Sequence, residues 1–260
     1  MPDRLAQLIR DHQPCVALSG AGVATESGIP DFRSPTGIWA KLDPMEYATL
    51  SAFRRDPTKV WWFYRQRIEM LTAAQPNRGH YALRELEELG LLSAIVTQNI
   101  DMLHRNAGSQ DVVEVHGSIS SSSCQSCGKR HELRRVEELL AADPDVPRCD
   151  ECAGVLKPDV VFFEEQLPVA AIDRAYALAK QARLLLVIGS TLEVHPVAGL
   201  PELTIAAGGQ VAIVNLGPTS FDRRAALKLD ASAGETLACV VDLLRQTSRH
   251  VGRAGATPEE

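Results

Sequence analysis

The sequence predicts an α/β fold in which a doubly wound parallel sheet carries two insertions, one helical and one forming a smaller lobe. Three observations lead to this fold class. Short, β-rich apolar runs alternate with longer amphipathic stretches, which is the pattern of buried parallel strands covered by helices. A glycine-rich turn follows the first apolar run, as in Rossmann-like sheets. Finally, 260 residues that are 45% hydrophobic suffice for one large domain with a satellite.

Six apolar runs are the expected strands, because each is short and rich in Val, Ile and Leu. They cover residues 15–18, 94–96, 112–115, 160–163, 184–188 and 211–214. Between them, the stretches 79–89 and 170–182 place apolar residues three and four positions apart with charges opposite. This spacing predicts amphipathic helices that cover the faces of the sheet.

Two long interruptions break this alternation and divide the chain into parts. Residues 34–76 are rich in Trp and Arg and are predicted to form a helical insertion, and residues 117–158 contain four of the six cysteines. The tail 246–260 has little apolar content and is predicted to be disordered. The remaining segments are assigned to the Rossmann-like sheet domain: 1–33, 77–116 and 159–245.

Charge and hydropathy argue against two kinds of partner. The formal net charge is −6, with no sequence-wide basic field that would favour nucleic acid. No apolar run approaches the roughly 20 residues that span a bilayer. Residues 1–13 are polar and amphipathic and carry no apolar targeting core, so a cytoplasmic protein without a membrane span is expected.

The cysteine pattern predicts a metal site. Cys124 and Cys127 form one Cys-x-x-Cys pair and Cys149 and Cys152 form a second, with a spacer long enough for a helix over residues 132–142. In a cytoplasmic chain four such thiols favour tetrahedral Zn²⁺ over disulfides. Four thiolates leave no open coordination position, so the metal of this zinc-binding lobe is expected to be structural. A zinc ribbon that binds nucleic acid is the alternative for this segment.

The first strand ends in a glycine-rich turn, Gly20-Ala21-Gly22. A strand that leads through Gly-x-Gly into a helix brings backbone N–H groups toward a pyrophosphate. The next glycine is Gly28, which is too far along the chain for the usual dinucleotide fingerprint. Alone, the turn is therefore as compatible with a structural role as with a nucleotide site.

The turn continues into Ser27-Gly28-Ile29-Pro30-Asp31-Phe32-Arg33, and four further segments follow in order: Thr97-Gln98-Asn99-Ile100-Asp101, Glu114-Val115-His116-Gly117, Gly189-Ser190-Thr191-Leu192 and Asn215-Leu216-Gly217. Together they resemble the motifs of the sirtuins, the NAD-dependent protein lysine deacylases, in their bacterial and archaeal form. The resemblance extends from about residue 15 to about residue 244. It implies that NAD is consumed as a co-substrate and that an acyl-lysine protein or peptide yields free lysine, nicotinamide and O-acyl-ADP-ribose.

The resemblance assigns roles to individual residues. It implies that His116 is the general base that accepts a proton from a ribose hydroxyl, that Asn99 orders a hydroxyl or a water, and that Asp101 organises the nicotinamide pocket. Without the resemblance, Asn99 and Asp101 are caps of a helix that begins near Met102. The positions implied to contact NAD are Gly20, Ala21, Gly22, Thr25, Asp31, Phe32, Arg33, Trp39, Gln98, Asn99, Ile100, Asp101, Gly189, Ser190, Thr191, Asn215, Leu216, Gly217 and Ala233. Those implied to line the peptide cleft are Val160, Val161, Phe162, Glu193 and Val194.

A pair of residues in the helical insertion bears on the acyl group. Tyr64 and Arg67 lie three apart on one helical face, and Ala48 precedes them. In sirtuins that remove succinyl or malonyl groups, a Tyr-x-x-Arg pair binds the distal carboxylate and an alanine leaves room. The resemblance therefore implies desuccinylase or demalonylase activity beside deacetylase activity. The alternative is a solvated arginine face with Tyr64 half buried.

Two positions depart from the family pattern. Ala24 stands where a serine is common, which removes a hydroxyl contact to the cofactor, and Glu164 stands where a glycine is usual, beside the expected peptide cleft. Two other functions stay open at this point: an NAD-dependent protein ADP-ribosyltransferase, and a non-catalytic module that binds NAD or ADP-ribose. The intact set of Asn99, Asp101 and His116 argues against the non-catalytic module.

Overall fold

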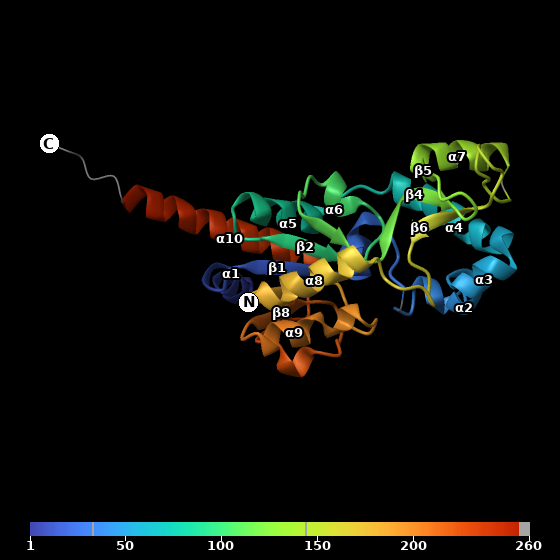
Figure 1. Cartoon of the computed structure of the whole chain (residues 1–260). Coiled ribbons are helices and arrows are strands. Elements are labelled where there is room, and N and C mark those ends of the chain that lie inside the picture. Colours follow the sequence, from blue (N-terminus) through green and yellow to red (C-terminus); the bar gives the residue numbers. More distant parts are fainter. Residues whose placement is uncertain (33, 144, 255–260) are drawn as a thin grey trace.

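A six-stranded parallel sheet forms the centre of the larger lobe (Figure 1). The structure, a computed structural model, describes residues 1–32, 34–143 and 145–254, with side chains up to residue 246. The strands lie in the order β3-β2-β1-β7-β8-β9. Their bounds are β1 Cys15–Ser19, β2 Ala94–Thr97, β3 Val112–Glu114, β7 Leu184–Ile188, β8 Gln210–Val214 and β9 Leu227–Leu229. Chain order reverses between β1 and β7, which is where open α/β sheets bind ligands.

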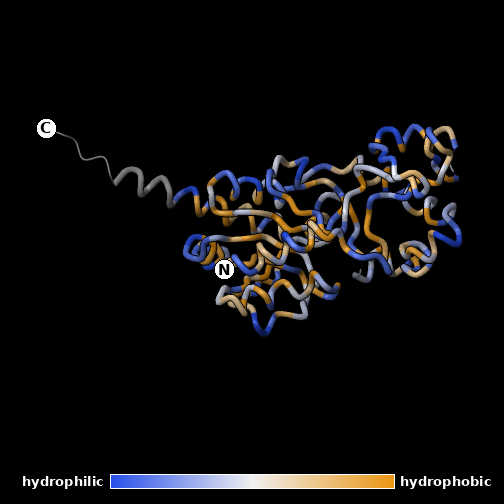
Figure 2. Tube along the Cα trace, viewed as in Figure 1, coloured by the Kyte–Doolittle hydropathy of each residue, from blue (hydrophilic) through white to orange (hydrophobic). Residues whose placement is uncertain are grey.

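Helices cover both faces of this sheet, so the doubly wound arrangement is confirmed. Alternate residues of each strand enter two different cores, because successive side chains point to opposite faces. Helices α1, α5 and α10 pack on one face, and α8 and α9 pack on the other. Figure 2 shows the hydrophobic trace concentrated between these layers. The bounds are α1 Pro2–Asp11, η1 Ala21–Ser27, α5 Arg78–Glu88, α6 Leu103–Asn106, α8 Val169–Gln181, η3 Val197–Gly199, α9 Leu200–Ala206, η4 Asp222–Arg224 and α10 Ala233–Ala254.

The helical insertion and the cysteine segment together form the smaller lobe. An antiparallel sheet in the order β5-β4-β6 packs beside α4 and α7. Trp61 joins the two parts, because its fully buried ring lies in their common core and its Nε1 donates to the carbonyl of Leu156 at 2.7 Å. The bounds are η2 Ile38–Ala40, α2 Pro44–Tyr47, α3 Leu50–Arg55, α4 Pro57–Ala73, β4 Gly117–Cys124, β5 Arg130–Glu132, α7 Leu133–Ala142 and β6 Leu156–Val160.

Most expected elements are present, but two expectations are wrong. The helices over 79–89 and 170–182 correspond to α5 and α8. The run 160–163 is not a strand of the parallel sheet, because β6 ends at Val160 and pairs with β4 in the small sheet. The sixth parallel strand is instead β9.

The second wrong expectation concerns the tail. Helix α10 continues to Ala254, whereas the sequence predicts disorder from Gln246. Residues 255–260 lie outside the described residues. In the part of the chain that the structure describes, we find no helix with the length and apolar character needed to span a membrane.

Candidate active site and metal centre

The predicted motifs meet at one edge of the parallel sheet, where its strands end. The segments 20–22, 98–101, 189–191 and 215–217 follow β1, β2, β7 and β8 respectively, and His116 follows β3. The carboxyl ends of parallel strands lie at the same edge, so motifs that are far apart in the sequence become neighbours. This edge faces the smaller lobe (Figure 1).

Two glycine loops approach each other backbone to backbone. The N–H of Gly22 donates to the carbonyl of Gly189 at 2.8 Å, and a Cβ added at Gly20 or Gly22 would lie 2.7 Å from a backbone atom of Gly189. Gly189 itself has a φ of 58°, in the left-handed region. Beside these loops, Gln98 Nε2 donates to Ser190 Oγ at 2.9 Å. The contact requires glycine at these positions and leaves a narrow, backbone-lined turn of the kind that receives phosphates.

The first turn continues into η1, a short 3₁₀ helix. Ala21 is half-buried at its start, and Thr25 Oγ1 donates to the carbonyl of Gly22 at 2.9 Å. Ala24 is buried in the core of the smaller lobe, so a hydroxyl is absent from a position that packs against that lobe.

His116 is held in one orientation by the backbone. Its Nδ1 lies 3.0 Å from the carbonyl oxygen of Gln98, which can only accept a hydrogen bond. Nδ1 therefore carries the proton, and Nε2 keeps its lone pair. Burial lowers the pKa of His116 from its ordinary value, although the hydrogen bond to Gln98 opposes this. The side chain is thus a neutral imidazole at neutral pH, with Nε2 able to accept a proton.

Asn99 is positioned by a buried polar chain. Its Nδ2 donates to the carbonyl of Gly20 at 3.2 Å, and its backbone N–H donates to Thr97 Oγ1 at 3.1 Å. Thr97 accepts in turn from Ser19, whose hydroxyl also contacts His104 Nε2, both at 2.8 Å. These groups are buried between β1, β2 and α6, so the amide of Asn99 has little freedom to turn.

Asp101 is a buried carboxylate that caps α6. Its Oδ1 accepts from the backbone N–H of Leu103 at 2.9 Å, so the predicted cap is present. Burial raises the pKa of Asp101 to about 6, while the hydrogen bond from Leu103 and the charge of Arg67 lower it. Ile100, between the two polar residues, packs into the core of the smaller lobe. The ionised carboxylate of Asp101 therefore lowers the stability of the folded protein.

Replacing Asp101 with Asn should stabilise the protein at pH 8 while reducing its activity. Because the folded pKa of Asp101 lies above the unfolded value, ionisation opposes folding above about pH 6, and the penalty fades as the pH falls from 6 toward 4. Asn keeps the cap on Leu103 without the charge. We expect a gain of roughly 1–3 kcal/mol in unfolding free energy at pH 8.

Urea unfolding of the wild-type protein and the Asp101→Asn variant at pH 8 and pH 5 measures this gain. Asp242→Asn, at an exposed position on α10, is the matched control and should change stability little at either pH. Equal stability of wild type and Asp101→Asn at pH 8 would contradict the burial penalty.

The segment after the first glycine turn stacks against the helical insertion. Phe32 and Trp39 stack at 5.5 Å between ring centroids, and Trp39 stacks on Phe63 of α4 at 5.8 Å. Asp31 Oδ1 accepts from the N–H of Ser34 at 2.8 Å. Arg33, also predicted to contact the cofactor, lies outside the described residues.

The residues that the sequence predicts to bind the acyl group are buried. Tyr64 stacks on Phe162 at 5.3 Å, and the Arg67 guanidinium lies over the rings of Phe32 and Phe63 at 5.2 and 5.7 Å. Arg67 is 5% exposed and makes neither an ion pair nor a hydrogen bond with any described residue. The alternative of a solvated arginine face with a half-buried Tyr64 is therefore wrong.

Ala48 connects the predicted acyl pocket to the predicted peptide-binding segment. It is buried, and its carbonyl accepts from the N–H of Phe163 at 2.8 Å. The N–H of Val161 donates to the carbonyl of His116 at 2.9 Å, so residues 160–163 run from the histidine to Ala48. Within this run Val160 and Phe162 are buried and Val161 is half-buried.

Glu164, which stands where the family usually has glycine, keeps a φ of 74°. Both of its carboxylate oxygens bind Ser51 at the start of α3, one through the backbone N–H at 2.8 Å and one through the hydroxyl at 2.9 Å. These bonds hold an otherwise strained backbone in place. On the other side of the predicted cleft, Glu193 is exposed and accepts from Thr191 at 3.3 Å, and Val194 is half-buried.

The loop after β8 has partners that the motifs did not reveal. Lys228 Nζ donates to the carbonyls of Asn215 at 2.6 Å and Gly217 at 3.0 Å, and the N–H of Gly217 donates to Asp230 Oδ1 at 2.9 Å. Leu216, between them, is 69% exposed. The sequence Leu-Lys-Leu in β9 could have revealed this role, because successive side chains of a strand point to opposite faces and Lys228 therefore lies on the face opposite its two leucine neighbours.

Ala233 is buried at the start of α10. The next residue, Gly234, donates its N–H to Glu26 Oε1 at 2.8 Å, and Ser232 donates its hydroxyl to the same oxygen. Glu26 therefore ties η1, which follows the first glycine turn, to the beginning of α10. The two ends of this contact are more than two hundred residues apart in the sequence, so no local motif predicts it.

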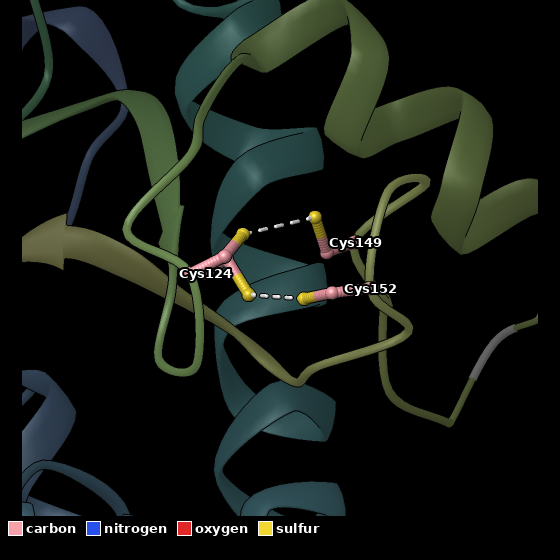
Figure 3. Close-up of side chains that lie close together, drawn as sticks. Cys124, Cys149 and Cys152 are labelled. Carbon is pink, nitrogen blue, oxygen red and sulfur yellow. Dashed lines mark hydrogen bonds between the residues drawn. The ribbon is translucent and has the colours of Figure 1, made fainter.

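The four predicted metal ligands converge in the smaller lobe, as Figure 3 shows for Cys124, Cys149 and Cys152. Cys124 Sγ lies 3.4 Å from Cys152 Sγ, Cys127 Sγ lies 3.7 Å from Cys149 Sγ, and all four sulfurs lie within 4.8 Å of one another. Tetrahedral zinc with bonds of about 2.3 Å places its sulfurs about 3.8 Å apart. None of the four cysteines is in a disulfide. The cluster therefore fits one structural Zn²⁺.

Lys129 links the two cysteine turns. Its Nζ donates to Asp150 at 3.0 Å and to Glu151 at 2.9 Å, both between the second pair of cysteines. These ion pairs are exposed and contribute little stability on their own. They align the two turns of the metal centre.

Comparison with known proteins places this geometry in context. Residues 20–196 match the family model described as the Sir2 family. The chain is similar to an NAD-dependent protein deacylase of Pyrococcus furiosus, with 40% identity over 96% of this chain and 100% of that protein. It is also similar to an NAD-dependent protein deacetylase of Sulfurisphaera tokodaii, with 42% identity over 95% of this chain and 98% of that protein.

Solved structures with related sequences have the same fold. A mutant of a Sir2 homologue in complex with ADP-ribose has a TM-score of 0.91 and 39% identity, covering 96% of this chain and 98% of that one. A complex of Sir2, a p53 peptide and NAD⁺ has a TM-score of 0.83 and 37% identity, covering 97% of this chain and 99% of that one.

Proposed function

This chain belongs to the Sir2 family, and from that premise we propose that it is an NAD-dependent protein lysine deacylase. One observation carries the proposal beyond family membership. His116, with its proton fixed on Nδ1 by Gln98, shares one sheet edge with the two contacting glycine loops and with Asn99. A base, a phosphate-binding turn and a polar ribose site are what the reaction requires at one place.

In the proposed reaction, the acyl-lysine carbonyl oxygen attacks C1′ of the nicotinamide ribose of NAD, and nicotinamide leaves. Asn99 orders a ribose hydroxyl or a water, and Asp101 contributes negative charge to the nicotinamide pocket. Nε2 of His116 accepts the proton of the ribose hydroxyl that attacks the acyl carbon. The lysine amine then leaves the acyl carbon and a water adds there, so that free lysine is released and the acyl group stays as an ester on ADP-ribose. The four-thiolate zinc takes no part in these steps, because all of its coordination positions are filled.

An acyl-lysine peptide and NAD provide the direct test. The zinc-loaded protein should release one nicotinamide for each lysine unmasked and form O-acyl-ADP-ribose. Label from adenine-tritiated NAD that stays on a protein acceptor would indicate ADP-ribosyl transfer instead. Tight NAD binding without nicotinamide release would indicate a non-catalytic module.

The environment of the protein is part of this proposal. Four unpaired cysteines at one metal site suit a reducing compartment such as the cytoplasm. A net charge of −6 argues against a nucleic-acid partner.

The acyl pocket favours an acidic acyl group, such as succinyl or malonyl. A buried guanidinium without a counter-ion is costly, and a ligand carboxylate would supply the missing charge and hydrogen bonds. Arg67 is close to this state: it is buried and forms no ion pair with a described residue, although the charge of Asp101 acts on it, and it has the Tyr64 phenol beside it and only a methyl group at Ala48. Acetyl-lysine would leave the guanidinium unpaired and would therefore be the poorer substrate.

Replacing Arg67 with Met should lower kcat/KM for a succinyl-lysine peptide about 10- to 100-fold, because it removes a charge-assisted hydrogen bond. The loss for an acetyl-lysine peptide should be much smaller. Arg65→Met is the matched control, because Arg65 lies on the same helix with an exposed side chain that pairs with Glu69. Steady-state kinetics on both peptides measure the effect. An equal decrease in kcat/KM for the two peptides would show that Arg67 does not bind the acyl carboxylate. It would leave the assignment as a deacylase unchanged.

A further inference from the structure

A buried histidine lies against the metal centre although it is outside the two Cys-x-x-Cys pairs. His131 is the middle residue of β5 and pairs with Ser122 on β4. Its side chain is 1% exposed. Its Nε2 lies 3.4 Å from Cys149 Sγ, within the distance of a hydrogen bond to sulfur. The histidine thus reaches from the first cysteine turn to a ligand of the second.

Four thiolates place a net charge of −2 on a zinc centre. N–H donors to the sulfurs spread that charge and hold each ligand in position. Cys124 Sγ receives a backbone donor, the N–H of Ser126 at 3.4 Å. Among the described residues, His131 is the one side chain that contributes a nitrogen donor to any of the four sulfurs.

The surroundings of His131 favour donation to sulfur over another role. Asp150 is the nearest acid, but its Oδ1 lies 3.9 Å from Nε2 and already accepts from Lys129 at 3.0 Å, while its Oδ2 lies 3.5 Å from Arg135 Nε. The nearest acceptor for Nε2–H is therefore the sulfur of Cys149. A fifth ligand atom on the metal is not required, because the four sulfurs lie within 4.8 Å of one another and suffice for tetrahedral coordination.

We propose that His131 is a positioning residue of the metal centre, whose Nε2–H donates to the Cys149 thiolate and retards loss of zinc. One strand, β4, connects the metal centre to the active site. β4 runs from Gly117, next to His116, to Cys124, so the metal fixes the far end of the strand that begins beside the proposed base. The proposal does not depend on the deacylase assignment.

Zinc release tests this role. The zinc-loaded protein is mixed with a colorimetric chelator in excess, and the rate of metal transfer is recorded for the wild type, His131→Ala and His131→Gln. We expect about 10-fold faster release from His131→Ala. The Gln side chain keeps an N–H donor, so His131→Gln should recover a large part of the wild-type rate. Arg130→Ala, on the same strand with its side chain exposed, is the control and should release zinc as the wild type does.

Cobalt substitution separates a donor from a direct ligand and does not depend on the folding of any variant. The Co²⁺-loaded wild type should show the visible absorption of a four-thiolate site. A spectrum of three thiolates and one nitrogen would overturn the proposal, because His131 would then be a ligand. Equal release rates from the wild type, His131→Ala and His131→Gln would also overturn it.

Discussion

Replacing His116 with Ala should lower the rate of acyl-lysine turnover by about 10²- to 10⁴-fold, which is the usual contribution of a general base. The imidazole is fixed by a hydrogen bond from Nδ1 to the carbonyl of Gln98, so Nε2 is directed and unprotonated without further rearrangement. Alanine removes that acceptor. A water in its place is a weaker base and is not held in position.

The matched control for this substitution is His12→Ala. His12 follows α1 and contacts Gln210 at the amino end of β8, the opposite edge of the sheet, so its loss should leave turnover unchanged. Nicotinamide release and peptide deacylation are measured together by chromatography, and thermal unfolding shows whether each variant is folded. Near-normal turnover in a folded His116→Ala variant would remove the base from our mechanism.

The pH dependence gives a second measure of the same residue. Burial lowers the pKa of His116, and a base is active above its pKa, so the imidazole stays available through the neutral range and is lost only in acid. The rate ratio between wild type and His116→Ala should therefore be constant from about pH 7 to pH 9 and should narrow only in acid, below the ordinary histidine pKa of about 6.5. A ratio that collapses already at neutral pH would mean that the histidine is charged in the folded protein.

The sheet and the location of the site could be predicted because both depend on short-range patterns. Strands buried on both faces appear as continuous apolar runs, as in β1 and β7, and the motifs that follow such strands must meet at one edge. The cysteine spacing predicted the metal cluster for the same reason, since each pair closes a local turn. The resemblance to sirtuins then supplied the roles.

The predictions that were wrong or left open depend on contacts between residues that are distant in the sequence. β6 contains Lys157 and Pro158, which disfavour a strand, but the lysine forms an ion pair with Glu165 at 2.9 Å. The strand therefore begins at Leu156, four residues before the apolar run, and ends at the first residue of that run. Arg67 is buried because it lies on the same face of α4 as the buried residues Val60, Phe63 and Leu71, which are four or seven positions away, and spacing alone could not decide which face would be buried.

Glu164 illustrates a limit of motif comparison. Its left-handed backbone explains why a glycine suits this position, yet the carboxylate satisfies the same conformation by binding Ser51 from more than a hundred residues away. Because the two residues are so far apart in the sequence, the residues around Glu164 do not predict this contact.

Removing zinc should unfold the smaller lobe and abolish activity while the parallel sheet persists. Structural zinc bound by cysteines contributes on the order of 10 kcal/mol to folding at neutral pH, more than the whole stability of many domains. The strand β4 links Cys124 to His116, and the common core around Trp61 links the cysteine segment to the acyl pocket. Loss of the metal therefore removes one wall of the active site together with its own lobe.

Treatment with a chelator, followed by readdition of zinc, tests this expectation. Limited proteolysis should cut first within residues 117–158 of the zinc-free protein, with a partial loss of circular dichroism, and readded zinc should restore both the resistance and the activity. Cys124→Ser should behave as the zinc-free protein, because it removes a ligand at the end of β4. Cys239→Ser is the control, since Cys239 is exposed on α10, away from the cluster, and should leave zinc content unchanged. A zinc-free protein that resists proteolysis as the loaded one does would show that the lobe is held by its hydrophobic core and not by the metal.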